Sequence, residues 1–198
     1  MRPEKRELRS RQIETAAYEL LDEKGFAGLS VQAVAKAAKA SNETLYKWYG
    51  DKTGLFEALI RGNTALVAEA LETATLDNPI GSLHHVGSVL LTMLLGDRAI
   101  ALNKAAAADA TGTLGRALAR EGRSAVAPRI IGIMQSAIAE RALAGGTPQE
   151  MAETYFSLLI GDLQVRRVTG ALPKPHDDYI AIRAADAVVS LTRLFPPA

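Results

Sequence analysis

The stretch LSVQAVAKAAKASNETLYKWYGDK, residues 29–52, contains two short helical patterns separated by a turn. In the first pattern, apolar residues recur at the three- and four-residue spacing that places them on one helical face: Val31, Val34, Ala35 and Ala38. Ser30 and Ser41 precede the two patterns, where a hydroxyl can accept a hydrogen bond from a free backbone N–H group. The second pattern has only Leu45 and Tyr49 at an inward spacing. Such a helix presents side chains rather than filling a core, which indicates a helix-turn-helix whose second helix enters the major groove of DNA.

The residues on either side of this stretch are also helical. A first helix is predicted from Arg9 or Ser10 to Lys24, and Gly25 ends it. Its buried stripe consists of Ile13, Ala16, Ala17, Leu20 and Leu21. Asp51 is the predicted N-cap of a further helix that continues to about Thr75. The apolar face of that helix consists of Leu55, Phe56, Leu59, Ile60, Leu66 and Val67.

These residues resemble the DNA-binding domain of the TetR family of bacterial transcriptional repressors, over about residues 9–60. The matching pieces occur in the family order with matching gaps: Ile13-x-x-Ala16-Ala17-x-x-Leu20-Leu21-x-x-x-Gly25-Phe26, Leu29-Ser30-Val31-x-x-Val34-Ala35, and Thr44-Leu45-Tyr46-x-x-Tyr49-x-x-Lys52-x-x-Leu55. One position departs from the family, which usually has a glycine in the turn where this chain has Lys39. A lysine in a left-handed conformation is strained, so we expect either a looser turn or a Lys39 that stays helical.

The rest of the chain has helical periodicity and no alternating segments. Helices are predicted at 80–95, 97–110, 113–143, 148–169 and 178–195, the third being one helix or two because Gly122 and Pro128 fall inside it. The predicted fold is therefore all-α, with about nine helices. An N-terminal three-helix domain (1–52) precedes a larger helical domain (53–198) for ligand binding and dimerisation. The second domain is similar, in helix order, to the C-terminal domain of one large TetR subgroup.

Composition limits the possible classes of protein. The chain has 198 residues, 48% of them hydrophobic, and a net charge of +1. We expect no membrane span, no secretory signal and a cytoplasmic location. Basic residues crowd the N-terminus, where they are either phosphate contacts or part of a solvated tail: Arg2, Lys5, Arg6, Arg9 and Arg11. An enzyme is disfavoured, because the chain has no Cys, few His and no Gly-rich phosphate loop. No cofactor and no metal ion are expected.

The resemblance implies two sets of DNA-contacting residues. The positions that touch base edges or adjacent backbone are Gln32, Asn42, Glu43, Lys47 and Trp48. The positions that contact phosphates are Ser30, Ser41, Thr44, Tyr46 and Lys52. Amides can pair with adenine, lysine can donate to guanine, and glutamate can accept from cytosine. Taken singly, each of these residues is better explained as a helix cap or part of a solvated surface, and only the whole motif favours DNA contact.

The resemblance also implies a homodimer and a small-molecule site. Dimer candidates, which are alternatively intrachain core, are Leu158, Leu159, Asp162, Val165, Arg166, Val188, Val189, Thr192 and Phe195. Ligand candidates, also alternatively core, are His84, His85, Met93, Asn103, Met134, Gln135, Tyr155 and Phe156. The expected function is a regulator, in the form of a repressor, that binds a palindromic double-stranded DNA operator and is released by a small, mostly apolar effector. The alternative is a constitutive DNA-binding or docking module without an effector.

Overall fold

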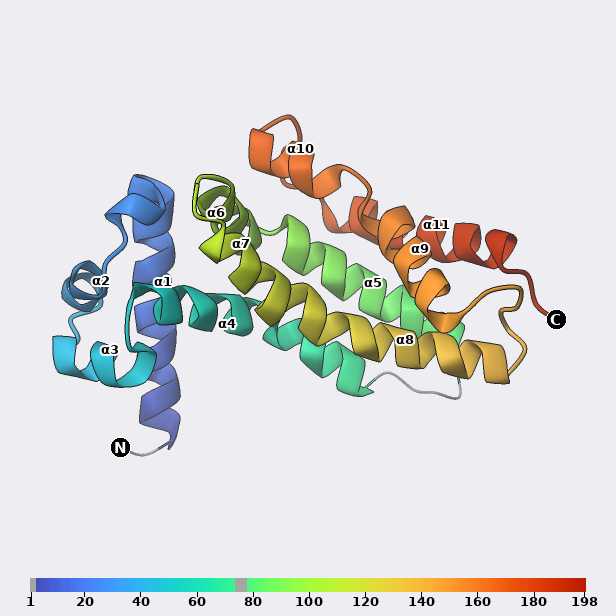
Figure 1. The fold of residues 1–198 in the computed structure, drawn as a ribbon, viewed down its shortest axis with the longest axis horizontal. Helices are drawn as coiled ribbons and strands as arrows, with labels where there is room; N and C mark the ends of the chain where they lie inside the picture. Colours follow the sequence, from blue (N-terminus) through green and yellow to red (C-terminus); the bar gives the residue numbers. More distant parts are fainter. Residues whose placement is uncertain (1–2, 74–77) are drawn as a thin grey trace. The chain divides into compact units, whose positions relative to one another are not determined.

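The computed structural model describes residues 3–73 and 78–198, and these residues form helices with no strand (Figure 1). The N-terminal helices are α1 (Pro3–Gly28), α2 (Val31–Ala37), α3 (Asn42–Tyr49) and α4 (Lys52–Thr73). The following helices are α5 (Pro79–Leu95), α6 (Asp97–Ala107), α7 (Thr113–Leu118), a π-helical turn η1 (Ala119–Arg123), α8 (Ser124–Ala139), α9 (Pro148–Ile160), α10 (Leu163–Thr169) and α11 (Asp177–Leu194). The predicted all-α fold, with an N-terminal helix-turn-helix, is confirmed.

The described residues contain more helices than the nine predicted, because two long predicted helices are broken. The 113–143 helix is interrupted by η1, whereas Pro128 lies inside α8 without ending it. The 148–169 helix is interrupted after Ile160 at Gly161, whose φ is +49°. Glycine adopts this left-handed conformation without the steric cost of a Cβ atom.

Helix α1 begins at Pro3, earlier than predicted. Glu4 lies in its first turn, and Arg11 pairs with Glu7 one turn away at 2.6 Å, so both features favour the extra turns. At the other end the backbone leaves helical geometry at Gly25, with φ +62°, where the sequence predicted a stop. The predicted end of the helix from Asp51 at about Thr75 lies outside the described residues.

The chain forms two compact units. The first unit contains the residues up to Gly62 together with Ala101–Glu121, and the second contains Asn63–Ile100 and Gly122–Ala198. The chain thus passes from one unit to the other within α4, within α6 and within η1. This structural division differs from the sequence boundary at residues 52 and 53, which remains a prediction about functional domains.

The core of the first unit is formed by side chains from helices α1, α2, α3 and α4, together with some from α6 and α7. Val31, Val34 and Ala35 are buried, as the periodicity predicted, and Ala38 is half-buried. The other buried side chains include Ile13, Ala17, Leu21, Leu29, Leu45, Leu55, Phe56, Leu102 and Leu114. This core fixes the faces of α2 and α3 that turn away from solvent.

The second unit is built around α5, which packs with α8, α9 and α11 (Figure 1). Its core depends on a close approach at Gly87 in α5, where an added Cβ atom would lie 2.4 Å from the Tyr155 hydroxyl. That hydroxyl donates a 2.6 Å hydrogen bond to the carbonyl of Leu83. Burial raises the pKa of the Tyr155 phenol above its usual value, so the donor stays protonated.

The helices of the described residues differ from membrane spans in length and hydropathy. None of them, taken singly, combines enough of both to cross a bilayer. The pair α5 and α6, bent by 57° between Leu95 and Asp97, satisfies the length and composition criteria when the two helices are taken together.

Candidate nucleic-acid interface

Two serine side chains cap the N-termini of the two helices of the helix-turn-helix, α2 and α3. Ser30 Oγ accepts a hydrogen bond from the backbone N–H group of Ala33 at 3.0 Å, and Ser41 Oγ accepts one from Thr44 at 3.1 Å. The hydroxyls of Ser41 and Thr44 are 2.7 Å apart. The predicted N-caps are confirmed. The predicted phosphate contacts of Ser30, Ser41 and Thr44 remain predictions.

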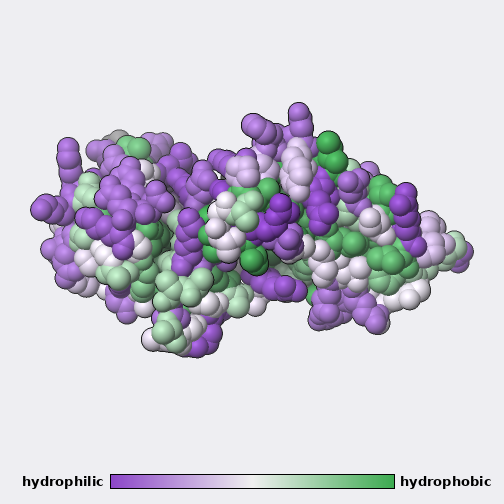
Figure 2. All heavy atoms as spheres, turned by 90° about the horizontal axis from the view of Figure 1, so that it is seen from above, coloured by the Kyte–Doolittle hydropathy of each residue, from purple (hydrophilic) through white to green (hydrophobic). Residues whose placement is uncertain are grey.

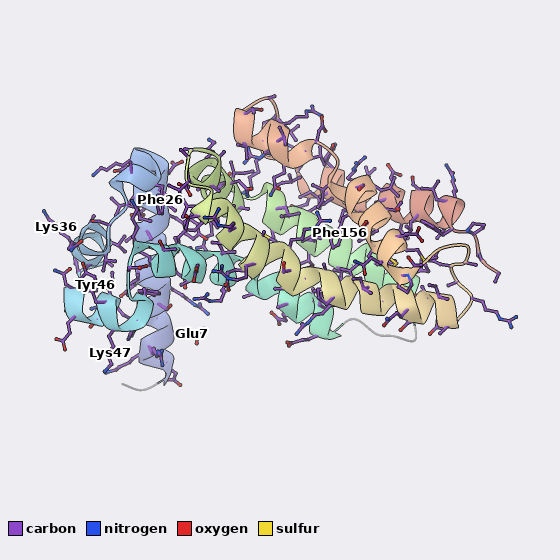
Figure 3. The ribbon with its side chains drawn as sticks, viewed as in Figure 1. Glu7, Phe26, Lys36, Tyr46, Lys47 and Phe156 are labelled. Carbon is purple, nitrogen blue, oxygen red and sulfur yellow. The ribbon has the colours of Figure 1, made fainter. Side chains whose placement is uncertain are left out.

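Helix α3 turns one side inward and the other to solvent. Leu45 is fully buried, and Tyr49 is half-buried beside it. Asn42, Glu43 and Lys47 are exposed. Lys47 projects from α3, and Lys36 projects from α2 (Figure 3). The exposed side of α3 therefore offers amide, carboxylate and ammonium groups, which are the groups that recognise base edges.

Gln32 and Tyr46, both predicted DNA contacts, bind each other. Gln32 Nε2 donates a 2.6 Å hydrogen bond to the hydroxyl oxygen of Tyr46, across the surface between α2 and α3. Because the phenol accepts this bond, its own O–H group stays available as a donor. This arrangement suits a phosphate contact by Tyr46, with Gln32 holding the phenol in place.

Two other candidates are packed against the first unit rather than free in solvent. Trp48 is half-buried, and the Arg6 guanidinium lies 5.5 Å from the centroid of its ring. Lys52 Nζ lies 3.9 Å from the centroid of the Phe26 ring, and burial lowers the pKa of this lysine. Their DNA contacts remain predictions that must be compatible with this packing.

The turn between α2 and α3 differs from both alternatives predicted from the sequence. Lys39 has a φ of +52°, so it is neither helical nor in a looser turn but adopts the left-handed conformation itself. Two backbone bonds define the turn: Lys39 N–H donates to Lys36 at 3.2 Å, and Ala40 N–H donates to Ala35 at 2.8 Å. This is the Schellman pattern that usually contains glycine. Both predicted alternatives were wrong, and the carbonyl groups of Ala38 and Lys39 accept hydrogen bonds from Arg9, a residue distant in sequence.

The ligand candidates do not share one environment. Met134, Tyr155 and Phe156 are buried. His84, Met93 and Asn103 are half-buried, and His85 and Gln135 are exposed. Asn103 belongs to the first unit and the others to the second.

Two of the buried ligand candidates have partners within the chain. The hydroxyl of Tyr155 is occupied by its bond to Leu83, so this side chain packs in the core. The Arg123 guanidinium lies 5.4 Å from the centroid of the Phe156 ring.

The dimer candidates fall into a buried set and a surface set. Leu159 and Val188 are buried inside the second unit, which favours for these two residues the alternative of an intrachain core over a dimer interface. The other predicted residues lie wholly or partly at the surface: Leu158, Asp162, Val165, Arg166, Val189, Thr192 and Phe195. Tyr179, Ile182 and Leu194 are also exposed hydrophobic residues of α11, and none of them was among the predicted dimer residues. For Ile182 the available signal was its seven-residue spacing from Val189, which places the two on the same helix face.

Comparison with known protein families gives two matches, one in each part of the chain. Residues 13–59 match the family model described as bacterial regulatory proteins, tetR family. Residues 81–194 match the model of the C-terminal domain of AefR-like transcriptional repressors. The second match covers more than half of the chain.

Individual proteins give the same result. The uncharacterized HTH-type transcriptional regulator YdeS of Bacillus subtilis (strain 168) is 46% identical over 43 residues, which span only 22% of this chain and 22% of that relative. The crystal structure of a TetR transcriptional regulator from Agrobacterium tumefaciens matches with a TM-score of 0.74 and 27% identity, over 98% of this chain and 95% of that chain. The flavonoid-responsive regulator FrrA matches with a TM-score of 0.72 and 25% identity, over 96% of this chain and 98% of its own.

The fold and the helix-turn-helix thus define a DNA-binding transcription regulator. The chain belongs to the TetR family, with an N-terminal helix-turn-helix and an AefR-like C-terminal domain. This is a family of regulators and not of enzymes, as the sequence predicted. Its members are typically ligand-responsive repressors.

Proposed function

We propose that this protein binds a palindromic operator as a homodimer through α3, and that a small, mostly apolar effector releases it. The single observation that carries the proposal is the division of α3 into a buried Leu45 and an exposed polar face with Asn42, Glu43 and Lys47. A helix anchored by so little apolar surface is suited to insertion into a groove. The protein acts in the cytoplasm, where the operator DNA is located.

The polar residues of α3 and its N-cap have separate roles in this proposal. Asn42, Glu43 and Lys47 read base edges, because their side chains are exposed and have no hydrogen-bonding role in the caps. The hydroxyls of Ser41, Thr44 and Tyr46 face phosphates and set the position of the helix on the duplex.

Dimerisation is supported by hydrophobic side chains that the second unit leaves exposed. Val165 on α10 is 65% exposed, and on α11 Ile182 is 62% and Val189 42% exposed. Figure 2 shows hydrophobic side chains reaching the surface in this part of the molecule. A two-fold dimer would bury them and would match a palindrome with two copies of α3.

A charge substitution tests this interface. I182D combined with V189D is expected to convert a dimer to a monomer by light scattering, because the charges would be buried without partners. The matched control is Arg193→Asp on the same helix, an exposed position that is not apolar. A wild-type monomer at micromolar concentration would contradict the dimer.

The effector is supported by family membership and by one structural relative. AefR-like domains belong to repressors, and the similar protein FrrA is described as flavonoid-responsive. A panel of apolar and aromatic compounds, flavonoids included, is expected to contain one that releases the DNA. If no compound does so, the constitutive alternative is favoured.

The DNA contacts are tested on duplexes that the wild-type protein selects from a randomised pool. Lys47→Ala is expected to change the preference at particular base pairs. Lys52→Ala is expected to weaken all duplexes alike and to lower the slope of log affinity against log salt by about one. Lys104→Ala on α6, an exposed lysine outside the helix-turn-helix, is the control. If both variants bound every duplex like wild type, the assignment of α3 would be wrong.

A further inference from the structure

The left-handed turn at Lys39 lacks the residue that usually makes it stable. At φ +52° the Cβ atom of a lysine crowds the following carbonyl group, a cost that glycine avoids. The turn sets the path from α2 into α3, because Ala40 and Ser41 are all that separate Lys39 from the first residue of α3. A contact beyond the two backbone hydrogen bonds of the turn would offset this cost and fix the angle at which α3 starts.

Arg9 on α1 supplies that contact from 30 residues away. Its Nη1 donates to the carbonyl oxygen of Ala38 at 3.3 Å, and its Nη2 donates to the carbonyl oxygen of Lys39 at 3.1 Å. The planar guanidinium spans two successive carbonyl groups, which a single ammonium group does not match. The two carbonyl groups lie at the C-terminal end of α2, where the helix dipole favours a positive charge.

Arg9 is itself held in position on α1. Nη1 also donates to Gln12 Oε1 at 3.0 Å, one helical turn away. The Nη1 and Nη2 groups of Arg9 thus donate to three oxygen atoms of the protein, those of the Gln12 side chain and of the Ala38 and Lys39 carbonyl groups. This use of its donors distinguishes Arg9 from Arg11, which pairs with Glu7 on the exposed surface of α1.

We propose that Arg9 is a positioning residue for α3: it binds the Ala38–Lys39 carbonyl pair and so takes the place of the glycine that such a turn usually contains. Arg9 acts on DNA binding through the turn and not by contacting a phosphate. The inference rests on the proposed function, in which α3 reads the operator.

A double-mutant cycle tests the inference on duplexes selected by the wild-type protein from a randomised pool. Arg9→Ala is expected to lower the affinity about tenfold, because the strained turn loses its two charged hydrogen bonds. Lys39→Gly alone is expected to bind like wild type. In the Lys39→Gly background, Arg9→Ala is expected to change the affinity by less than about twofold, because glycine makes the turn without help.

Three outcomes overturn the inference. The first is an Arg9→Ala defect of the same size in the Lys39→Gly background as in the wild-type background, which would indicate a role unrelated to the turn. The second is a fall of about one in the salt slope of Arg9→Ala, which would identify Arg9 as a phosphate contact. The third is an equal defect in the control Lys104→Ala, an exposed position of the first unit outside the helix-turn-helix. Thermal unfolding of each variant reports folding separately, since a general folding defect would not be rescued by Lys39→Gly.

The inference and the proposed function fail in distinguishable ways. If the wild-type protein enriches no duplex from the pool, the proposed function of α3 is wrong. If the wild-type protein enriches a sequence and Arg9→Ala binds that sequence with unchanged affinity, only the role of Arg9 is wrong.

Discussion

Helices α3 and α5 use their side chains in opposite ways. Helix α3 fully buries only Leu45 and exposes most of its polar side chains. Helix α5, in contrast, buries a run of apolar side chains that includes Leu83, Val86, Leu90 and Leu91. The comparison shows that α5 is held by packing along its whole length, whereas α3 is held by one fully buried side chain, the half-buried Trp48 and Tyr49, a serine cap and the turn before it. A helix such as α5 therefore tolerates changes at its ends, whereas a helix such as α3 does not.

The largest effect is expected from the apolar anchor of α3. Leu45→Ala should lower the free energy of unfolding by about 3 kcal/mol, because it deletes a fully buried side chain and leaves a cavity. DNA binding should be lost with it, since α3 would no longer be held against the first unit. Denaturant unfolding and gel-shift titration measure the two effects. Leu8→Ala, at a position 61% exposed on α1, should change stability by less than about 0.5 kcal/mol.

An intermediate effect is expected from the close approach in α5. Gly87→Ala should cost about 2 kcal/mol, because the new methyl group displaces the Tyr155 hydroxyl from its bond to Leu83. Gly132→Ala in α8 is the matched control, since an added Cβ atom there meets nothing within 4 Å. That control should stabilise the protein by about 0.5 kcal/mol, because alanine favours helix. Equal effects of the two changes would show that α5 is not tightly packed at Gly87.

The smallest effects are expected at the two helix caps, and they sharpen the comparison. Ser41 caps α3, and the Asn78 side chain caps α5 by accepting from Gly81 N–H at 2.9 Å. Ser41→Ala and Asn78→Ala should each cost about 1 kcal/mol. Amide hydrogen exchange should quicken throughout α3 in the first variant, but only in the first turn of α5 in the second. If amide exchange quickened along the whole of α5 in Asn78→Ala, the packing of α5 would not be what holds the rest of this helix in place.

The sequence predicted α3 better than it predicted the second unit, and the reason is physical. Serine caps and a thin apolar seam are local features, so the residue pattern alone was enough to assign Ser30, Ser41 and Leu45 correctly. The second unit depends on which apolar faces meet, and periodicity does not state that. Leu159 and Val188 therefore looked like interface residues but are buried in their own chain.

Other differences came from contacts between distant residues. The π-helical turn η1 is joined to α4 by ion pairs, Glu121 with Arg61 at 3.0 Å and Arg120 with Glu57. The pairing of Gln32 with Tyr46 crosses 14 positions, and the contact between Arg9 and the Lys39 turn crosses 30. The family resemblance marked Lys39 as unusual, but it did not indicate which residue contacts the turn.

The Arg9–Lys39 contact has an evolutionary consequence. If Arg9 takes the place of the glycine as proposed, a change from glycine to lysine in this turn costs less once an arginine is present at position 9, so one order of the two substitutions is favoured. Once both are in place, the loss of Arg9 is harmful unless the glycine returns first. Among relatives the two positions should then change together, and an engineered helix-turn-helix grafted from this chain must carry both residues.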